Sequence, residues 1–489
     1  MVARNKFAIS ILIKGKLLET YHLAKSLMFV LLLVNTAYAD VVLPDIFGDN
    51  MVLQQKTLAA IWGKAKANTQ LVLTTSWDDK SYATKTKPNG EWKIVVNTPS
   101  AGGPFDISIS DGEKIALSNV MIGEVWVCSG QSNMEMPLRG NSSPILNASE
   151  IILNADNEKL RLFTVGRASA AEPLTQLSGK WNESTSATAR DFSALAFQYG
   201  QILQKKLKVP VGIILSTVGG TTVEAWMSKR SLNDFSEVKV LPTFEGVKDP
   251  HKYPTSLFNG MIAPIIGYTI KGFLWFQGES NRHNPERYEH YLPAMVADWR
   301  KSWGLGDLPF YYVQIAPYEA KDKTRSGPRL REAQLNSSKT IPNSGMISAL
   351  DVGMENDIHA MDKTTLALRA SYWALGKTYG IKGIAYKSPE LNNLIVDGDK
   401  AILTFDNAPY LTSYRKPLTL FEIAGEDQRF YPAAAKISKN KITLQSDKVA
   451  SPVAVRYAYK EWVVGELYNN DGLPASSFRT DSWKLPYER

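Results

Sequence analysis

The chain has 489 residues and a formal net charge of +8, and 44% of its residues are hydrophobic while 21% are charged. A chain of this length is expected to form roughly two to four domains, and the composition excludes a largely disordered protein. Lysine and arginine are scattered, which argues against nucleic-acid binding. The 12 tryptophans and 21 tyrosines suit stacking on sugar rings, although aromatic side chains also build cores.

Residues 1–39 are typical of an export signal peptide. A basic start is followed by the apolar run 27–34 and by the small-x-small pattern Ala37-Tyr38-Ala39. The run is too short to span a bilayer. We therefore expect an exported protein, periplasmic or secreted, without stable membrane insertion.

Two segments have β patterns, one near each end of the chain. Residues 40–119 contain β-branched runs between turn signals, which predicts a β-sandwich-like N-terminal domain. Residues 386–489 return to such a pattern, with strands expected at 401–405 and 453–457, and predict a C-terminal β domain.

Residues 120–385 alternate between apolar strands and amphipathic helices, which predicts a parallel sheet covered on both faces. In such sheets ligands bind beyond the carboxyl ends of the strands. A long loop near the site is expected at 232–256. Strands are expected at 122–128, 211–216, 272–276, 310–315 and 346–350. Three helix faces are expected, from Leu195, Tyr199, Ile202 and Leu203, from Tyr288, Leu292, Met295 and Trp299, and from Leu368, Tyr372, Leu375 and Tyr379.

The first of these strands ends in the sequence Gly130-Gln131-Ser132-Asn133-Met134. An apolar strand that breaks at a glycine and places a serine in a turn is how α/β hydrolases present a nucleophile. Since position 134 is not glycine, this is not the G-x-S-x-G motif, and another class of hydrolase is implied. Taken alone, the stretch fits an ordinary serine-rich turn equally well.

Two other strand ends carry groups suited to a serine hydrolase. Gly219 and Gly220 follow the second strand, where backbone N–H groups could stabilise an oxyanion, although a helix start that needs glycine explains them equally well. Asn281 follows the third strand, and its amide could be a second donor. Glu279 in the same turn is either an acid partner or a structural hydrogen-bonding group.

His359 is the best placed of the five histidines to act as a general base. It lies beyond the fifth strand, with Asp357 two residues before it. A histidine beside a carboxylate is more often a surface pair, but a serine nucleophile needs a base. No H-E-x-x-H motif and no cysteine or histidine cluster occurs, so neither a metal nor another cofactor is expected. Cys128, the only cysteine, rules out an intramolecular disulfide and is expected to be a buried small hydrophobe.

Three of these motifs together resemble the sialate O-acetylesterase family of SGNH-type hydrolases, namely residues 130–134, 275–281 and 356–359. Residues 43–54 and 467–481 are similar to the opening and the ending of that family. The resemblance covers essentially the whole chain after the signal. It implies a flavodoxin-like catalytic domain flanked by β-rich domains, and an esterase that removes acetyl groups from sugar hydroxyls.

The resemblance also implies a role for each site residue. Ser132 is the implied nucleophile and His359 the general base. The implied oxyanion donors are the Ser132 N–H, Gly219 or Gly220, and Asn281. The side chains implied to position the substrate are Gln131, Asn133 and Gln277.

The acid behind His359 stays open between two carboxylates. The wider SGNH pattern has aspartate three residues before the histidine, where this chain has Asn356. In related acetyl-xylan esterases the glutamate of Gln-Gly-Glu looks like the acid, which is Glu279 here. Asp357 is slightly favoured, because a neighbour two residues away can orient an imidazole. Ala360 stands where the family usually has proline, which should loosen the turn that holds the histidine.

The motifs leave the sugar open. A sialate O-acetylesterase is favoured, and an acetyl-xylan or acetyl-mannan esterase is the alternative. A non-catalytic glycan-binding protein is less favoured, because Ser132, Asn281 and His359 are all present.

Overall fold

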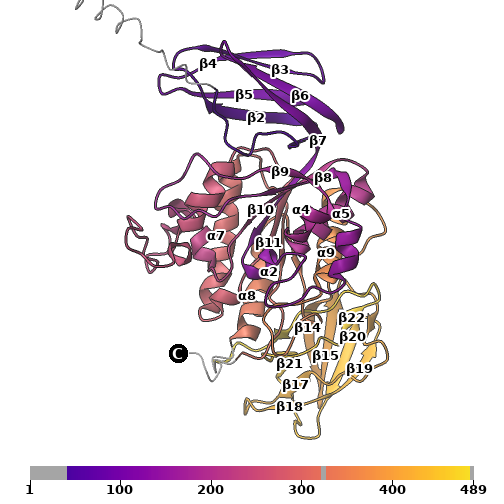
Figure 1. Ribbon diagram of the computed structural model, residues 1–489. Coiled ribbons are helices and arrows are strands. Elements are labelled where there is room, and N and C mark those ends of the chain that lie inside the picture. The colour runs from indigo at the N-terminus through magenta and orange to yellow at the C-terminus, as the bar shows by residue number, and fades with distance from the viewer. Residues whose placement is uncertain (1–40, 321–325, 485–489) are drawn as a thin grey trace, which may run out of the picture.

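Figure 1 shows the computed structural model, which describes residues 41–320 and 326–484. An α/β part lies in the middle, and the β-strands of the two chain ends lie at opposite ends of it (Figure 1). The export signal expected in residues 1–39 lies outside the described residues. Within them, no helix is both long enough and apolar enough to cross a membrane.

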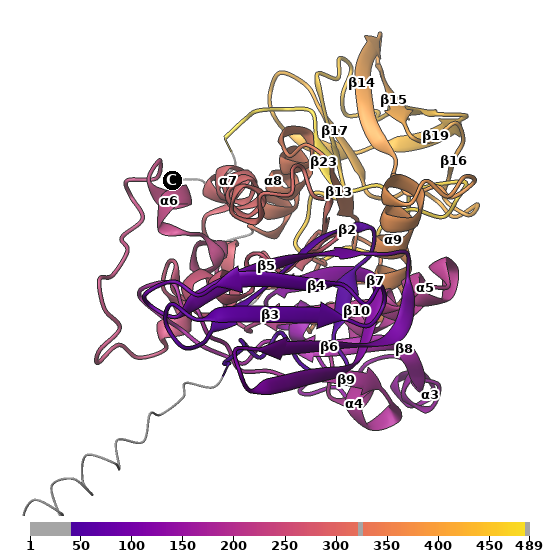
Figure 2. The same ribbon diagram turned by 90° about the horizontal axis from the view of Figure 1, so that it is seen from above.

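The N-terminal strands form a two-stranded pair, β2 with β5, and a sheet of β3, β4 and β6 that continues into β7 (Figure 2). In β5 every second residue is buried, as expected of a strand with one face on a core. Strand β7 is 17 residues long and runs on into the central sheet, so the predicted boundary at 119/120 falls inside a strand. The bounds are β1 (Val52–Gln54), β2 (Thr57–Lys64), β3 (Gln70–Thr75), β4 (Ser81–Lys85), β5 (Glu91–Thr98), β6 (Gly102–Ser110) and β7 (Lys114–Gly130).

The central sheet has the strand order β13-β12-β11-β7-β10-β8-β9. These neighbours pair in parallel except β8 and β9, which are antiparallel, so the sheet is mixed. All five predicted strands are present, whereas β8 and β9 were not predicted, because their short apolar runs are interrupted by charged and polar residues. The bounds are β8 (Asn157–Thr164), β9 (Trp181–Ser184), β10 (Val211–Thr217), β11 (Gly272–Phe276), β12 (Phe310–Val313) and β13 (Ser344–Ile347).

Helices cover both faces of this sheet. Helices α5 (Ala194–Leu207) and α9 (Lys363–Trp373) share one hydrophobic cluster with the sheet, and α7 (Pro285–Trp303) and α8 (Gly327–Thr340) share the other. A π-helical turn, η6 (Ala374–Thr378), continues α9. Shorter helices are α2 (Ser132–Glu135), α3 (Ala148–Leu153), α4 (Ser186–Arg190), α6 (Lys229–Leu232), η1 (Val223–Trp226), η2 (Pro250–Lys252), η3 (Phe258–Ile262), η4 (Ala263–Ile265) and η5 (Glu279–Asn281).

Two of the three predicted helix faces are confirmed and the third is only partly right. The α7 face is fully buried, and the α5 face is buried except for the half-buried Ile202. In the third, Leu368 is 36% exposed and Tyr372 is half-buried, whereas Leu375 is buried and Tyr379 packs against the same cluster. The buried face of α9 includes three small residues and two charged ones, which the spacing of large apolar side chains does not mark. Its buried members are Lys363, Leu366, Ala367, Arg369, Ala370, Ser371 and Trp373.

The C-terminal strands form separate small sheets around their own hydrophobic cluster. Both strands predicted there are confirmed, as β15 and β21. A buried ion pair between Arg282 and Glu461, 2.7 Å long, ties this part to the α/β part. The bounds are β14 (Glu390–Asp397), β15 (Lys400–Asp406), β16 (Leu411–Thr412), β17 (Phe421–Ala424), β18 (Phe430–Pro432), β19 (Ala434–Ser438), β20 (Lys441–Gln445), β21 (Ala454–Tyr457), β22 (Tyr468–Asn469) and β23 (Phe478–Arg479).

Candidate active site

The serine turn begins at Gly130, the last residue of β7. Gly130 has φ +141°, and a Cβ there would lie 2.1 Å from the carbonyl oxygen of Phe276 in the neighbouring strand β11. Only glycine tolerates both this conformation and this approach. The chain then turns sharply, the N–H of Gln131 donates to the same carbonyl at 3.0 Å, and Ser132 becomes the first residue of α2.

The loop after β13 brings a histidine to this serine. His359 Nε2 lies 3.1 Å from Ser132 Oγ, and His359 Nδ1 lies 3.3 Å from Asp357 Oδ1. The backbone N–H of His359 donates to the same carboxylate oxygen at 2.9 Å, so the imidazole and its carboxylate are held as one unit. The two side chains are 19% and 28% exposed, so a molecule from solvent can reach them.

Their surroundings shift both titrating groups. Burial lowers the pKa of His359, the Asp357 carboxylate opposes this, and the nearby Lys363 charge adds to the lowering. Burial alone would raise the pKa of Asp357, but hydrogen bonds from the Ser143 hydroxyl and the His359 backbone outweigh it, so this pKa lies below its usual value. At neutral pH the imidazole is therefore neutral and able to accept a proton, beside an ionised carboxylate.

Glu279 lies in a different environment from Asp357. Its side chain is buried, and Oε1 accepts a 2.5 Å hydrogen bond from Asn133 Nδ2. Burial raises its pKa. Of the two carboxylates that the sequence left open, Asp357 is the one in contact with His359.

The candidate oxyanion donors differ in what they already bind. A Cβ at Gly219 would lie 3.3 Å from Ser132 Cβ, but the N–H of Gly219 donates to Glu135 Oε2 at 2.7 Å. The N–H of Gly220, at φ +72°, has no hydrogen-bond partner within residues 41–320 and 326–484. Asn281 is fully buried, and its Nδ2 donates to Glu224 at 2.9 Å.

The three side chains expected to position the substrate are buried and bonded within the protein. Gln131 Oε1 accepts from the backbone N–H groups of Gly278 and Ser280, both at 3.3 Å. Gln277 Nε2 donates to Thr221 O at 3.0 Å and to Asn281 Oδ1 at 2.7 Å. Gln131 and Gln277 thus connect the turns around the serine, and a direct contact with substrate stays a prediction for both.

Asn133, the third of these side chains, connects the serine turn to the histidine loop. Its Nδ2 donates to the carbonyl of Ile358 at 3.0 Å, and its Oδ1 accepts from Lys363 Nζ at 2.6 Å. Direct contact with substrate stays a prediction for Asn133 as well.

Four residues of the site were missed by sequence reasoning: Ser143, Glu135, Arg167 and Lys363. Ser143 donates to Asp357, and Arg167 pairs with Glu135 beside the serine. Loop serines and arginines carry no sequence signal of such contacts. Lys363 had one, because it opens helix α9, where a cation opposes the helix dipole.

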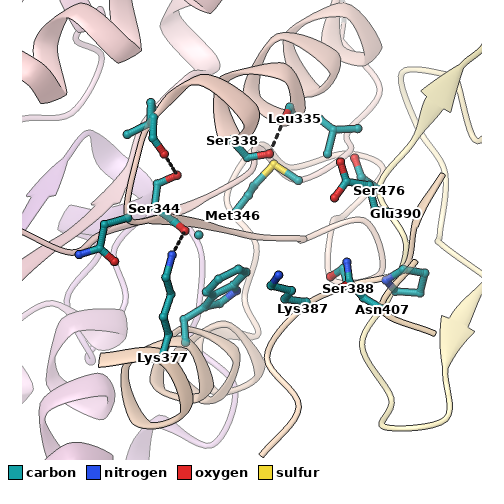
Figure 3. Close-up of a pocket in the computed structure, with 15 residues that line it drawn as sticks. Leu335, Ser338, Ser344, Met346, Lys377, Lys387, Ser388, Glu390, Asn407 and Ser476 are labelled. Atoms are coloured by element: carbon teal, nitrogen blue, oxygen red, sulfur yellow. Dashed lines mark hydrogen bonds between the residues drawn. The ribbon is translucent and has the colours of Figure 1, made fainter. Parts of the chain in front are cut away.

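One cavity lies apart from the site and another borders it. A cavity of about 260 Å³ lies at the start of β13 beside Trp373 and Lys377, and it contains none of the predicted site residues (Figure 3). A cavity of about 210 Å³ borders the turn that carries the serine, since Glu135 of α2 and Gly219 line it. Its other lining residues are Arg167, Ala168, Ser169, Val218, His251 and Leu257. His251 comes from the long loop expected at 232–256, so this loop lies near the serine.

A cysteine nucleophile and a bound metal ion are two other ways in which a hydrolase can work. Cys128 is fully buried, as expected, and burial raises the pKa of its thiol. In the described part of the chain, no three His, Cys, Asp or Glu residues are grouped to hold a metal ion.

A serine hydroxyl, an imidazole and a carboxylate in hydrogen-bonding order, at the edge of an α/β sheet, is the arrangement of serine hydrolases. The model of a protein family described as "Carbohydrate esterase, sialic acid-specific acetylesterase" matches residues 122–379. The sialate O-acetylesterases of Homo sapiens and Pongo abelii are each 30% identical to the chain over an alignment of 479 positions, which covers 88% of this chain and 90% of theirs.

A solved structure agrees with these matches. A carbohydrate acetylesterase from Xanthomonas citri has a TM-score of 0.83 and 34% identity, covering 91% of this chain and 100% of that one. The chain therefore belongs to the sialic acid-specific acetylesterase family of carbohydrate esterases. It is a carboxylic ester hydrolase.

Proposed function

We propose that the protein hydrolyses O-acetyl esters of sugars with Ser132 as nucleophile, His359 as general base and Asp357 as the acid that orients the imidazole. The observation that carries the proposal is the 3.1 Å approach of His359 Nε2 to Ser132 Oγ, with Asp357 on the opposite ring nitrogen. One ring nitrogen can then take the serine proton while the other donates to the carboxylate, as in a catalytic triad.

The reaction runs in two steps. Ser132 Oγ attacks the acetyl carbonyl while His359 Nε2 takes its proton, and the ionised Asp357 stabilises the imidazolium. The oxyanion is held by the N–H groups of Ser132 and Gly220, and the Asn281 amide completes the site if it turns from Glu224. The sugar hydroxyl leaves with the proton from His359. Water then repeats the sequence on the acetyl-enzyme and releases acetate.

The proposal extends to the type of each domain and to the place in the cell where the protein acts. The central sheet is that of a flavodoxin-like SGNH hydrolase domain, and the strands of the two chain ends form flanking β domains. The basic and apolar start of the chain, residues 1–39, supports export to the periplasm or the medium.

The sugar is proposed to be a sialic acid, since the human and orangutan relatives are named sialate O-acetylesterases. The cavity lined by Glu135, Arg167 and Gly219 is proposed to receive it. Arg167 uses one guanidinium nitrogen on Glu135, and its side chain is 67% exposed, which leaves further N–H groups facing solvent for a sugar carboxylate or hydroxyl.

The nucleophile is tested by replacing Ser132 with alanine and measuring acetate release. Ser132→Ala should lose at least about 1,000-fold in kcat, as removal of a serine nucleophile does elsewhere. Ser142→Ala is the matched control, because Ser142 is an exposed loop serine with its hydroxyl on Asn141. Retention of a sizeable fraction of activity by Ser132→Ala would overturn the assignment.

The sugar is tested with O-acetylated sialic acid, acetylated xylan and acetylated mannan. We expect the highest kcat/KM on the sialic acid, and Arg167→Gln should lower that value about tenfold while leaving the neutral polymers unchanged. A preference for xylan or mannan would assign the enzyme to the alternative substrate class.

A further inference from the structure

Lys363 opens helix α9, and its side chain is fully buried beneath the site. Its ammonium donates a 2.6 Å hydrogen bond to Asn133 Oδ1 and lies 5.3 Å from the centre of the Phe276 ring. A cation at a helix N-terminus opposes the helix dipole, and burial of an ammonium costs considerably more. Since both effects disfavour a charged lysine at this position, we looked for its role in the contacts that it makes with the site.

Asn133 joins Lys363 to the two chain segments that carry the hydroxyl and the imidazole. It directly follows Ser132, and its Nδ2 donates at 3.0 Å to the carbonyl of Ile358, the residue before the histidine. The same nitrogen donates to Glu279 at 2.5 Å. Since two acceptors face the nitrogen and the ammonium faces the oxygen, only one orientation of this amide satisfies all three contacts.

Glu279 supplies a negative charge for Lys363. It is 8% exposed, and its Oε2 has no hydrogen-bond partner among the described residues. Burial lowers the pKa of Lys363 to about 7, while attraction to Glu279, Asp357 and Asp362 opposes that shift. Arg282 is the other cation that acts on Glu279. Lys363 and Glu279 are thus both buried, and each favours the charged form of the other.

We propose that Lys363 is a positioning residue of the esterase site. Through Asn133 it fixes the serine turn to the histidine loop, and its positive charge disfavours protonation of His359. The inference rests on the proposed roles of Ser132 and His359, and adds a residue that touches neither substrate nor the reacting atoms.

Lys363 is positively charged in the pH range in which protonation of His359 would stop the reaction. With a pKa of about 7, Lys363 is cationic at lower pH, where the imidazole must stay unprotonated to accept the serine proton. The charged groups that face His359 are Asp357, which favours the imidazolium, and Lys363, which opposes it. Loss of the lysine charge should therefore raise the pKa of His359.

The first test is the pH profile of kcat/KM for Lys363→Met, which keeps length but removes charge and donor. The acid limb should move up by about 1 pH unit, and kcat should fall about tenfold with little change in KM. The matched control is Lys377→Met. Lys377 lies in η6, continuous with α9, donates to Ser344 O at 3.0 Å and lines the cavity at the start of β13 (Figure 3). Its profile should equal that of the wild type.

Two further variants separate charge from packing. Lys363→Arg keeps the charge, so its acid limb should stay in place even if kcat falls. The double variant Lys363→Met with Glu279→Gln leaves neither of the two charges buried without its partner, so it should fold where the single variant does not. Its acid limb should move in the same direction as that of Lys363→Met.

Stability against pH gives a readout independent of activity. The unfolded chain holds the Lys363 proton up to a pKa near 10.4 and the folded chain only up to about 7, so the unfolded state binds more protons between these values. The free energy of unfolding contributed by this group therefore rises with pH across that window. Lys363→Met should remove that rise from urea unfolding curves, and Lys377→Met should keep most of it.

Outcomes on each side are distinct. An acid limb that stays in place in both Lys363→Met and the double variant would overturn the inference, whatever happens to kcat. An unchanged kcat in a folded Lys363→Met would overturn the positioning part. Should Ser132→Ala remain active, the proposed function fails instead, independently of these profiles.

Discussion

At the scale of single residues, the Ser132 hydroxyl, the His359 imidazole and the Asp357 carboxylate lie in hydrogen-bonding order. Ser132 and His359 stood at strand ends with recognisable neighbours, and Asp357 was favoured because it lies two residues from the imidazole. Lys363 was missed because its contact with Asn133, far away in the sequence, leaves no local pattern. Its place at the start of a helix is unusual for a cation but does not by itself indicate a site. The sequence also does not separate Gly219 from Gly220, whereas in the structure the N–H of Gly219 is occupied by Glu135.

Replacement of each carboxylate by its amide decides the acid. Asp357→Asn should lower kcat by about 1,000-fold or more, because the wrong imidazole tautomer would be held toward the serine. Glu279→Gln should lower it much less, since Glu279 contacts Asn133 and not the imidazole. Steady-state kinetics of the two variants measures this, and a larger loss for Glu279→Gln would contradict the geometry.

Gly130 should be the least replaceable residue of the serine turn. Gly130→Ala places a Cβ 2.1 Å from the Phe276 carbonyl at φ +141°, so the free energy of unfolding should fall by more than about 4 kcal/mol. Gly220→Ala is the control at φ +72° with no atom within 4 Å, and it should cost about 1 to 2 kcal/mol. Chemical denaturation gives both values, and equal costs would mean that the close approach is not what selects glycine.

At the scale of elements, periodicity of large apolar residues located helices α5 and α7 but placed only part of the face of α9. That face also buries two alanines and several polar side chains, which the periodicity of large apolar residues does not mark. Strands buried on both sides were found, as continuous apolar runs are their signature, although the strand predicted at 346–350 begins and ends earlier, at Ser344–Ile347. The strands β8 and β9 lacked such runs.

The corrected face of α9 can be tested by stability. Leu366→Ala should lower the free energy of unfolding by about 2 to 5 kcal/mol, because Leu366 is fully buried. Leu368→Ala, at a side chain 36% exposed, should cost less than about 1 kcal/mol. Urea unfolding of both variants checks the order, and the reverse order would restore the face expected from the sequence.

At the scale of the whole molecule, the sequence indicated three segments, and the structure shows how they are joined. Strand β7 belongs to the N-terminal sheet and to the central one, and one hydrophobic cluster runs through both parts. At the other end Glu461 reaches Arg282, the residue after Asn281. Most tryptophans serve these cores rather than an open sugar platform.

The buried ion pair should be a main link to the C-terminal strands. Glu461→Gln should lower the free energy of unfolding by about 3 kcal/mol, because Arg282 would stay buried without this carboxylate. Glu422→Gln is the control, since its pair with Lys460 is more exposed at 3.6 Å, and it should cost less than about 1 kcal/mol. Thermal unfolding of both variants measures the difference, and equal small losses would remove the pair as a structural link.

The central claim is that the acetyl group passes through Ser132. The most direct measurement is rapid acid quenching of the enzyme mixed with p-nitrophenyl acetate, followed by mass spectrometry of its peptides. The account predicts one added acetyl group on the peptide that contains Ser132, formed within the first turnover and lost as acetate is released. Its absence from that peptide during turnover, or its presence on another residue with Ser132→Ala still active, would contradict the account.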